Sequence, residues 1–157
     1  MKSYKITLLP GDGIGPEITK VTKKILELVS NKFDFKLSFR EMPFGGSAID
    51  SDGIPLPERT LQECKSCDAV LLAAIGDPKY DELPRDKRPE TGLLNLRSSL
   101  DLFANIRPVK IIPSLTKASS LKEEFVNKVD LVVVRELTGG IYFGEPKGRI
   151  KTEKGER

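Results

Sequence analysis

The sequence predicts an α/β fold with a largely parallel sheet flanked by helices. Residues 68–75 are continuously apolar from Ala69 on, and residues 129–134 are a second segment that is apolar apart from Asp130. Strands that are buried on both faces of a parallel sheet have such runs. Segments with strand-like and helix-like patterns also alternate along the chain, which is typical of α/β proteins.

The N-terminal elements follow this alternation. Residues 4–9 predict a strand, and the glycine-rich residues 10–15 predict a turn. Pro16 suits the start of a helix, because proline lacks only a donor that has no partner in the first turn. The apolar residues that follow recur at helical spacing: Ile18, Val21, Ile25, Leu28 and Val29.

The later elements are shorter and more varied. Residues 33–41 alternate as a second strand, and residues 57–65 predict a short helix. Residues 76–89 form a polar loop with three prolines. The rest predicts a helix over 93–102, an extended segment over 103–109, a helix over 117–127, a buried strand over 129–134 and a short strand over 141–144.

Composition excludes several classes of protein. The chain has 157 residues, 38% of them hydrophobic and 31% charged, which is ordinary for a globular protein with one core. A net charge of +3 gives no reason to expect a nucleic-acid partner. The longest apolar run is too short to cross a membrane, and the first residues have no apolar signal region, so we expect a cytoplasmic protein without a membrane partner.

The cysteines and the missing histidines restrict the chemistry. Cys64 and Cys67 have C-x-x-C spacing, but one pair cannot complete a four-ligand zinc site. A redox pair would need a thioredoxin-like context, so inert thiols are favoured. The sequence has no histidine, so acid–base chemistry within it must use Tyr, Lys, Asp or Glu.

The glycine loop, Gly11-Asp12-Gly13-Ile14-Gly15, leaves two interpretations open. It follows a strand and precedes a helix, as a dinucleotide-binding loop does, but its spacing is G-x-G-x-G instead of G-x-G-x-x-G. It is therefore either a tight strand-to-helix turn or a site where backbone N–H groups meet an anionic cofactor.

Three arginines and one tyrosine are candidate site residues. Arg135 follows the apolar run 129–134, at the expected carboxyl end of a parallel strand, where α/β sheets bind ligands. With Arg97 and Arg107 it would bind a dicarboxylate, because a guanidinium makes two parallel hydrogen bonds to a carboxylate. Each arginine taken alone is more often a solvated charge or part of a surface ion pair, and Arg135 is the strongest single case because of its position. Tyr142 is either a general acid or an ordinary half-buried tyrosine.

Residues 8–17, 96–108 and 135–144 together resemble the β-decarboxylating dehydrogenases, and among them the isopropylmalate dehydrogenases. The resemblance covers essentially the whole chain in order. It implies an isopropylmalate dehydrogenase-like fold, truncated here. Residues 1–99 would be the N-terminal part of a first, cofactor-side domain, and residues 100–157 the beginning of a second domain for substrate and the dimer arm.

The resemblance also implies an activity. Members of this family oxidatively decarboxylate 3-isopropylmalate to 4-methyl-2-oxopentanoate in leucine biosynthesis, with NAD and Mg²⁺ or Mn²⁺ as cofactors, usually as homodimers. The expected metal ligands and the catalytic lysine lie beyond Arg157, so this chain alone is expected to be inactive. Two alternatives stay open: an inactive fragment that only associates with other subunits, or a sibling enzyme for homoisocitrate or tartrate.

By resemblance, Arg97, Arg107 and Arg135 bind the malate carboxylates, and Tyr142 protonates the enolate. Glu90 lies near the nicotinamide and the substrate side chain. Leu93 and Leu94 form an apolar wall for the isopropyl group, where isocitrate dehydrogenases have polar residues around Thr91 and Leu93. The remaining cofactor-binding residues implied are Ile14, Gly76, Asp77, Pro78, Lys79, Tyr80, Asp81, Glu82, Leu83, Pro84, Arg85, Asp86, Lys87, Arg88 and Pro89.

Two departures from the family lead to further expectations. Relatives commonly have Gly-Gly-Pro where this chain has Gly76-Asp77-Pro78, which adds a negative charge near the expected cofactor. Family chains are also about two domains long, so we expect an incomplete sheet with an exposed edge here. Such a chain would be marginally stable or would associate, because an open edge strand pairs with others.

Overall fold

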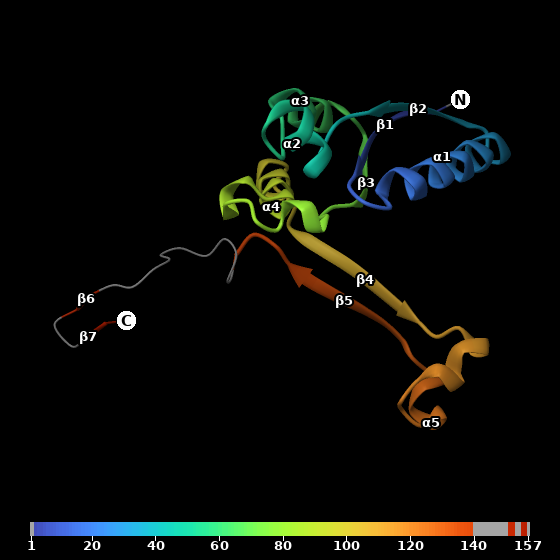
Figure 1. Ribbon diagram of the computed structural model, residues 1–157. Helices are drawn as coiled ribbons and strands as arrows, with labels where there is room; N and C mark the ends of the chain where they lie inside the picture. Colours follow the sequence, from blue (N-terminus) through green and yellow to red (C-terminus); the bar gives the residue numbers. More distant parts are fainter. Residues whose placement is uncertain (1, 140–150, 153–154, 157) are drawn as a thin grey trace. The chain divides into compact units, whose positions relative to one another are not determined.

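The chain has an α/β fold. A computed structural model describes residues 2–139, 151–152 and 155–156. The chain divides into two compact units, residues 1–100 and residues 101–157 (Figure 1). The assignment of these parts to a cofactor side and to a substrate and dimer side stays a prediction.

The first unit is built on a three-stranded parallel sheet. β1 (Lys2–Gly11) lies between β2 (Phe35–Glu41) and β3 (Ala69–Ala74), and both pairs are parallel. Parallel neighbours need crossover connections, and here these contain helices. The predicted parallel sheet is therefore confirmed in this unit.

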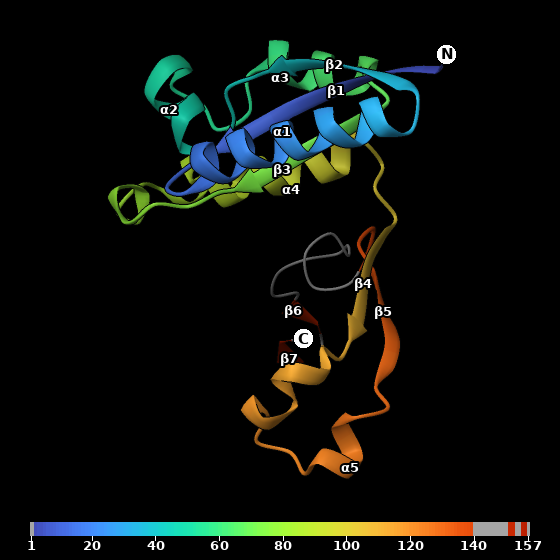
Figure 2. The same ribbon diagram turned by 90° about the vertical axis from the view of Figure 1, so that its right-hand side faces the viewer.

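Helices connect and cover the strands. α1 (Gly15–Lys32) joins β1 to β2 and lies against one face of the sheet (Figure 2). α2 (Gly46–Asp52) and α3 (Glu58–Ser66) precede β3. After β3 come the 3₁₀ turns η1 (Pro78–Tyr80) and η2 (Arg85–Lys87), followed by α4 (Pro89–Ser99). α4 begins and ends earlier than predicted, because Pro89 suits a first helical turn and Leu100 already forms the C-cap.

The core of the first unit lies on the sheet face opposite α1. Leu9, Met42, Phe44, Cys64 and Leu96 form one buried cluster, which joins β1 to α3 and α4. The prediction that residues 68–75 form a fully buried strand is wrong. Ala69 is exposed and the rest of β3 is half-buried, because among the described residues β3 lies at an edge of the sheet.

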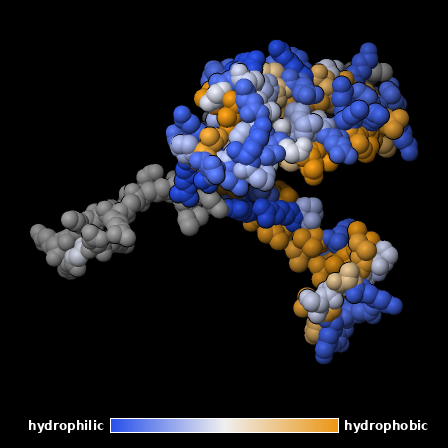
Figure 3. Space-filling model, viewed as in Figure 1, coloured by the Kyte–Doolittle hydropathy of each residue, from blue (hydrophilic) through white to orange (hydrophobic). Residues whose placement is uncertain are grey.

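α1 is confirmed as a helix, but the five apolar residues that predicted it are exposed. Thr19 and Ser30 are buried, and the Thr19 hydroxyl donates to the carbonyl of Gly15. The space-filling view shows hydrophobic residues at the surface in this part of the unit (Figure 3). The exposed apolar stripe consists of Ile18, Val21, Ile25, Leu28 and Val29, between 37% and 69% exposed.

The second unit is an antiparallel ribbon. β4 (Ala104–Lys110) pairs with β5 (Asp130–Glu136), and η3 (Pro113–Ala118) and α5 (Glu123–Val126) lie between them in the sequence. β6 (Lys151–Thr152) and β7 (Gly155–Glu156) form a short antiparallel pair. η3 and α5 replace the single predicted helix over 117–127.

The prediction of a buried parallel strand over 129–134 is wrong. β5 is antiparallel to β4, and Val132, Val133 and Val134 are 54%, 47% and 61% exposed. A continuous apolar run cannot by itself distinguish a buried parallel strand from an uncovered ribbon. The predicted strand over 141–144 lies outside the described residues. Within the described part of the chain, none of the helices has the length and hydropathy needed to cross a membrane.

Candidate functional site

The glycine loop is a closely packed turn. Gly11 has a φ of +69°, and a Cβ atom on it would lie 1.8 Å from the carbonyl oxygen of Ala74. A Cβ atom on Gly15 would lie 1.8 Å from the carbonyl oxygen of Pro10. Both glycines are therefore required by backbone packing alone, which favours the tight-turn interpretation.

Asp12, inside this loop, joins three segments of the first unit. Its carboxylate accepts hydrogen bonds from the backbone N–H groups of Gly46 at 2.9 Å, Ser47 at 2.9 Å and Gly76 at 3.0 Å. The side chain is only 6% exposed, so these three donors replace the water that a carboxylate would otherwise need. The carboxylate thus accepts hydrogen bonds from the backbone N–H groups at the start of α2. Sequence analysis did not single out Asp12.

Two of the predicted site residues, Gly76 and Glu90, are close neighbours. A Cβ atom on Gly76 would lie 3.2 Å from Oε1 of Glu90. Gly76 also borders the glycine loop, because the Cβ position of Gly13 lies 3.8 Å from the carbonyl oxygen of Gly76. Ile14, the next residue of that loop, is 66% exposed.

Residues 76–89, predicted to contact the cofactor and called the cofactor loop below, are shaped by hydrogen bonds within the loop. The Asp77 side chain accepts a 3.0 Å hydrogen bond from the backbone N–H of Lys79 and so caps η1. The departure from Gly-Gly-Pro therefore has a local structural role. Arg88 Nε donates to the carbonyl of Leu83 at 2.9 Å, which closes the far end of the loop.

Lys79 and Tyr80 are engaged by Asp50 of α2. Lys79 Nζ lies 2.7 Å and the Tyr80 hydroxyl 2.9 Å from the same oxygen, Asp50 Oδ2. The hydrogen bonds from Lys79 and Tyr80 lower the pKa of Asp50, and the bond with Asp50 raises the pKa of Lys79. Burial raises the pKa of the Tyr80 phenol; Lys79 opposes this shift and Asp50 adds to it.

The rest of the cofactor loop is open to solvent. Its exposed side chains include acidic and basic residues, which offer hydrogen-bond acceptors and donors to a polar cofactor. Leu83 and Arg88 are half-buried and Pro89 is buried. The exposed members are Pro78, Lys79, Asp81, Glu82, Pro84, Arg85, Asp86 and Lys87.

α4 presents a mixed stripe. Glu90, Leu94 and Arg97 are spaced by four and three residues and so share one face of the helix. Leu93 has the complementary spacing, three residues after Glu90 and four before Arg97, and it also packs against the buried core cluster. Both leucines predicted to meet an isopropyl group therefore flank this face of α4.

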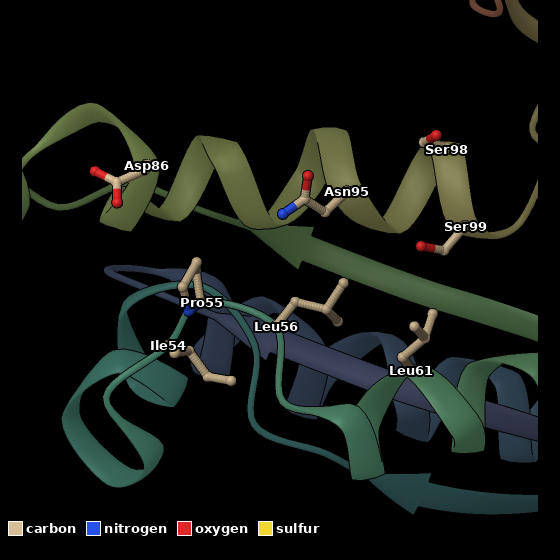
Figure 4. A pocket seen from close by; sticks show the side chains of 8 residues that line it. All are labelled: Ile54, Pro55, Leu56, Leu61, Asp86, Asn95, Ser98 and Ser99. Carbon is tan, nitrogen blue, oxygen red and sulfur yellow. The ribbon is translucent and has the colours of Figure 1, made fainter.

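A separate face of α4 borders a cavity of about 450 Å³ (Figure 4). Apolar residues of segment 54–61 form one wall and polar side chains form the other. The cavity contains neither Glu90 nor Arg97, and Asp86 is its one residue from the predicted site. Its lining residues are Ile54, Pro55, Leu56, Leu61, Asp86, Asn95, Ser98 and Ser99.

The second unit brings Arg107 and Arg135 onto one face of the β4–β5 ribbon. Arg135 is directly opposite Asn105, and Arg107 is two residues further along β4, so all three share a face. Arg107 Nε donates to Asn105 Oδ1 at 3.3 Å. The prediction that Arg135 ends a parallel strand is wrong, because β5 is antiparallel to β4. The two arginines nevertheless lie together, as a carboxylate site requires.

Two predictions concern residues that the structure does not describe. Tyr142 is one of these residues, and the metal ligands are expected beyond Arg157. Within residues 2–139, 151–152 and 155–156, no group of three or more Asp, Glu or Cys side chains could hold a metal ion. The described residues therefore do not fit a divalent metal site.

Comparison with known proteins identifies the family. The model of the family described as isocitrate/isopropylmalate dehydrogenase matches residues 5–157. The chain belongs to this family. The resemblance stated from the sequence is thereby confirmed.

Named relatives and solved structures agree with this assignment. The chain is 88% identical to a 3-isopropylmalate dehydrogenase of Prochlorococcus marinus (strain NATL2A) and 66% identical to one of Synechococcus sp. (strain CC9605), over its whole length. It spans 44% of the length of each. Crystal structures of isocitrate dehydrogenase from Methylococcus capsulatus and a β-decarboxylating dehydrogenase from Thermococcus kodakarensis share the fold. The Methylococcus structure is 28% identical with a TM-score of 0.70, and the match covers 98% of this chain and 40% of that one. The Thermococcus structure is 30% identical with a TM-score of 0.61, and the match covers 85% of this chain and 33% of that one.

Proposed function

We propose that this chain contributes substrate-binding and cofactor-binding residues to an NAD-dependent 3-isopropylmalate dehydrogenase. The reaction converts 3-isopropylmalate and NAD⁺ to 4-methyl-2-oxopentanoate, CO₂ and NADH. The product has the carbon skeleton of leucine, which agrees with a role in leucine biosynthesis. The observation that carries the proposal is the stripe on α4, where Leu94 lies between the charged residues Glu90 and Arg97.

The arginines would bind and orient the substrate. Arg97 of α4 and the pair Arg107 and Arg135 of the ribbon each offer a planar fork that matches a carboxylate. 3-Isopropylmalate has two carboxylates and one branched aliphatic group. Arg97, which shares a face of α4 with Leu94, is complementary to a carboxylate next to an aliphatic group.

Leu94 would select against a third carboxylate. Isocitrate has a carboxylate where 3-isopropylmalate has its isopropyl group. Against an aliphatic wall that carboxylate would lose water without gaining a partner, which is costly. Leu93 would support Leu94 from the core side.

NAD, when bound, accepts the hydride removed from the substrate. Ile14, Gly76 and Glu90 would face its nicotinamide, because Gly76 lies beside Glu90 and borders the glycine loop that carries the exposed Ile14. Exposed residues of the cofactor loop, such as Arg85 and Lys87, would contact the rest of the cofactor. Tyr142 would donate the proton to the product carbon. A Mg²⁺ or Mn²⁺ ion is also part of the proposal, and residues outside the described ones would bind it. Formation of a homodimer, as is usual in the family, is part of the proposal as well.

The test is NADH formation with 3-isopropylmalate, NAD⁺ and Mn²⁺. Two proteins are compared: this chain alone, and a chimera in which it replaces the corresponding residues of the 88% identical Prochlorococcus relative. We expect turnover by the chimera and none by the chain alone. A chimera that oxidises homoisocitrate or tartrate in preference would establish a sibling enzyme. A folded chimera without any turnover would leave the inactive fragment as the correct alternative.

A further inference from the structure

One carboxylate outside every motif engages the cofactor loop. Asp50 lies on α2, 29 residues before Lys79, yet its Oδ2 atom accepts from both Lys79 Nζ and the Tyr80 hydroxyl. Lys79 Nζ also lies 4.7 Å from the centre of the Tyr80 ring. The three side chains therefore form one cluster, with a cation, an anion and a phenol in mutual contact.

The backbone of α2 is shaped to receive Tyr80. The tyrosine is 6% exposed, and a Cβ atom on Gly46 would lie 1.9 Å from its ring. Only a glycine at position 46 leaves room for the ring. The Asp50 oxygen then satisfies the hydroxyl at the edge of the buried ring, as a buried tyrosine requires.

The start of the same loop is also fixed. The backbone N–H of Gly76 donates to the buried carboxylate of Asp12, and Asp12 also binds the first residues of α2. α2 therefore supports the loop twice, through Asp12 at residue 76 and through Asp50 at residues 79 and 80. The first half of the loop is consequently held in one conformation.

We infer that Asp50 is a positioning residue for NAD, and that Lys79 and Tyr80 anchor the cofactor loop to α2 instead of contacting the cofactor. This inference rests on the proposed function. Asp50 acts by fixing the backbone of residues 76–80, so that Gly76 stays beside Glu90 and Ile14. The contacts to NAD then come from Ile14, from Gly76 and from exposed loop residues that have no part in the anchor, such as Arg85 and Lys87.

An ordinary surface ion pair is the competing explanation. Both Lys79 and Asp50 side chains are 55% exposed, and such pairs contribute little alone. The cluster differs because a buried phenol shares the same oxygen. α2 also offers a matched control: Asp52 makes a 2.7 Å ion pair with Arg59 that does not involve the cofactor loop.

The kinetic test compares Asp50→Ala with Asp52→Ala in the chimera. For Asp50→Ala we expect the KM for NAD⁺ to rise roughly fivefold, the scale of one lost hydrogen bond, with kcat changed by less than about twofold. Asp50→Asn retains an acceptor for the hydroxyl and should restore part of the affinity, and Tyr80→Phe should resemble Asp50→Ala more weakly. Asp52→Ala should leave both constants unchanged. An unchanged KM in Asp50→Ala, or equal effects of both alanine variants, would overturn the inference.

A second measurement does not need activity. Amide hydrogen exchange of residues 76–82 should be faster in Asp50→Ala than in the parent chain and unchanged in Asp52→Ala. Lack of turnover by the parent chimera would refute the proposed function, whereas equal exchange in all three proteins would refute the anchor itself. The two failures are therefore distinguishable.

Discussion

The two units of this chain treat similar apolar sequences differently. In the first unit, Leu9, Phe44 and Leu96 come together from a strand, a connecting segment and a helix and are at most 4% exposed. In the second unit, the valines of β5 stay about half exposed on a two-stranded ribbon. A run of apolar residues is therefore buried only where a further layer covers it.

The two faces of the ribbon differ in where the arginines lie. Arg107 and Arg135 share one face with Asn105 and Val133, whereas Val134 lies on the other. Both faces carry exposed aliphatic residues. An isolated two-stranded ribbon is marginally stable in water, and exposed aliphatic residues on it favour association. The two units should accordingly respond to very different extents to the same kind of substitution.

The largest expected contrast is between Phe44→Ala and Val134→Ala. Phe44 is fully buried, so its truncation should lower the free energy of unfolding of the first unit by about 3–5 kcal/mol. Val134 is 61% exposed, so its truncation should change the free energy of unfolding of the second unit by less than about 0.5 kcal/mol. Urea unfolding followed by circular dichroism measures both. Equal losses would show that the ribbon is packed as tightly as the core.

Asp12→Ala tests the carboxylate that joins the glycine loop to α2. It leaves three backbone N–H groups without their acceptor, and we expect the unfolding free energy to fall by roughly 3 kcal/mol. The control is Asp68→Ala, which removes a single exposed hydrogen bond from Lys5 and should cost less than about 1 kcal/mol. The account of the glycine loop fails if Asp12→Ala is no more destabilising than its control.

The exposed faces predict self-association. Both α1 and the β4–β5 ribbon expose aliphatic stripes, and β2 and β3 are edge strands among the described residues. Replacing Val132 and Val134 together by lysine should weaken association without changing the stability of the first unit. Sedimentation velocity measures this. A parent chain that is monodisperse and melts cooperatively as a monomer would contradict the prediction.

The smallest effect concerns the cysteines. Burial raises the pKa of Cys64 to about 11, and it is 5% exposed, so at pH 8 its alkylation should be at least about tenfold slower than that of Cys67. Because the folded state favours the neutral thiol, this contribution to stability is complete below pH 9 and is lost as the pH rises towards 11. Mass spectrometry after timed labelling gives the two rates. Equal rates would place Cys64 outside the core.

The sequence alone predicted the first unit better than the second. Residues 16–29, 57–65 and 68–75 have periodicity or length that suits one kind of element, and each became that element. The apolar run 129–134 suits several kinds of element. In the structure it pairs with β4, which lies about 25 residues earlier in the sequence, and no local pattern reveals such a pairing.

The candidate site shows the same limit. Leu93 and Leu94 are neighbours with identical chemistry, and both flank the face of α4 that carries Glu90 and Arg97. Only the structure shows that Leu93 also packs against the core. In the sequence, Asp12 stands out only as a member of the glycine loop. Asp50 had no signal at all, because its partners are about 30 residues away and a single aspartate before a glycine turn is ordinary.

The most direct test of the central proposal is the substrate preference of the chimera. The quantity is kcat/KM for 3-isopropylmalate divided by that for isocitrate, with NAD⁺ and Mn²⁺, in the parent chimera and in its Leu94→Ser variant. The account predicts a ratio well above one that falls in the variant by roughly tenfold, because the apolar wall disfavours the third carboxylate. A ratio below one in the parent, or a ratio unchanged by Leu94→Ser, would contradict it.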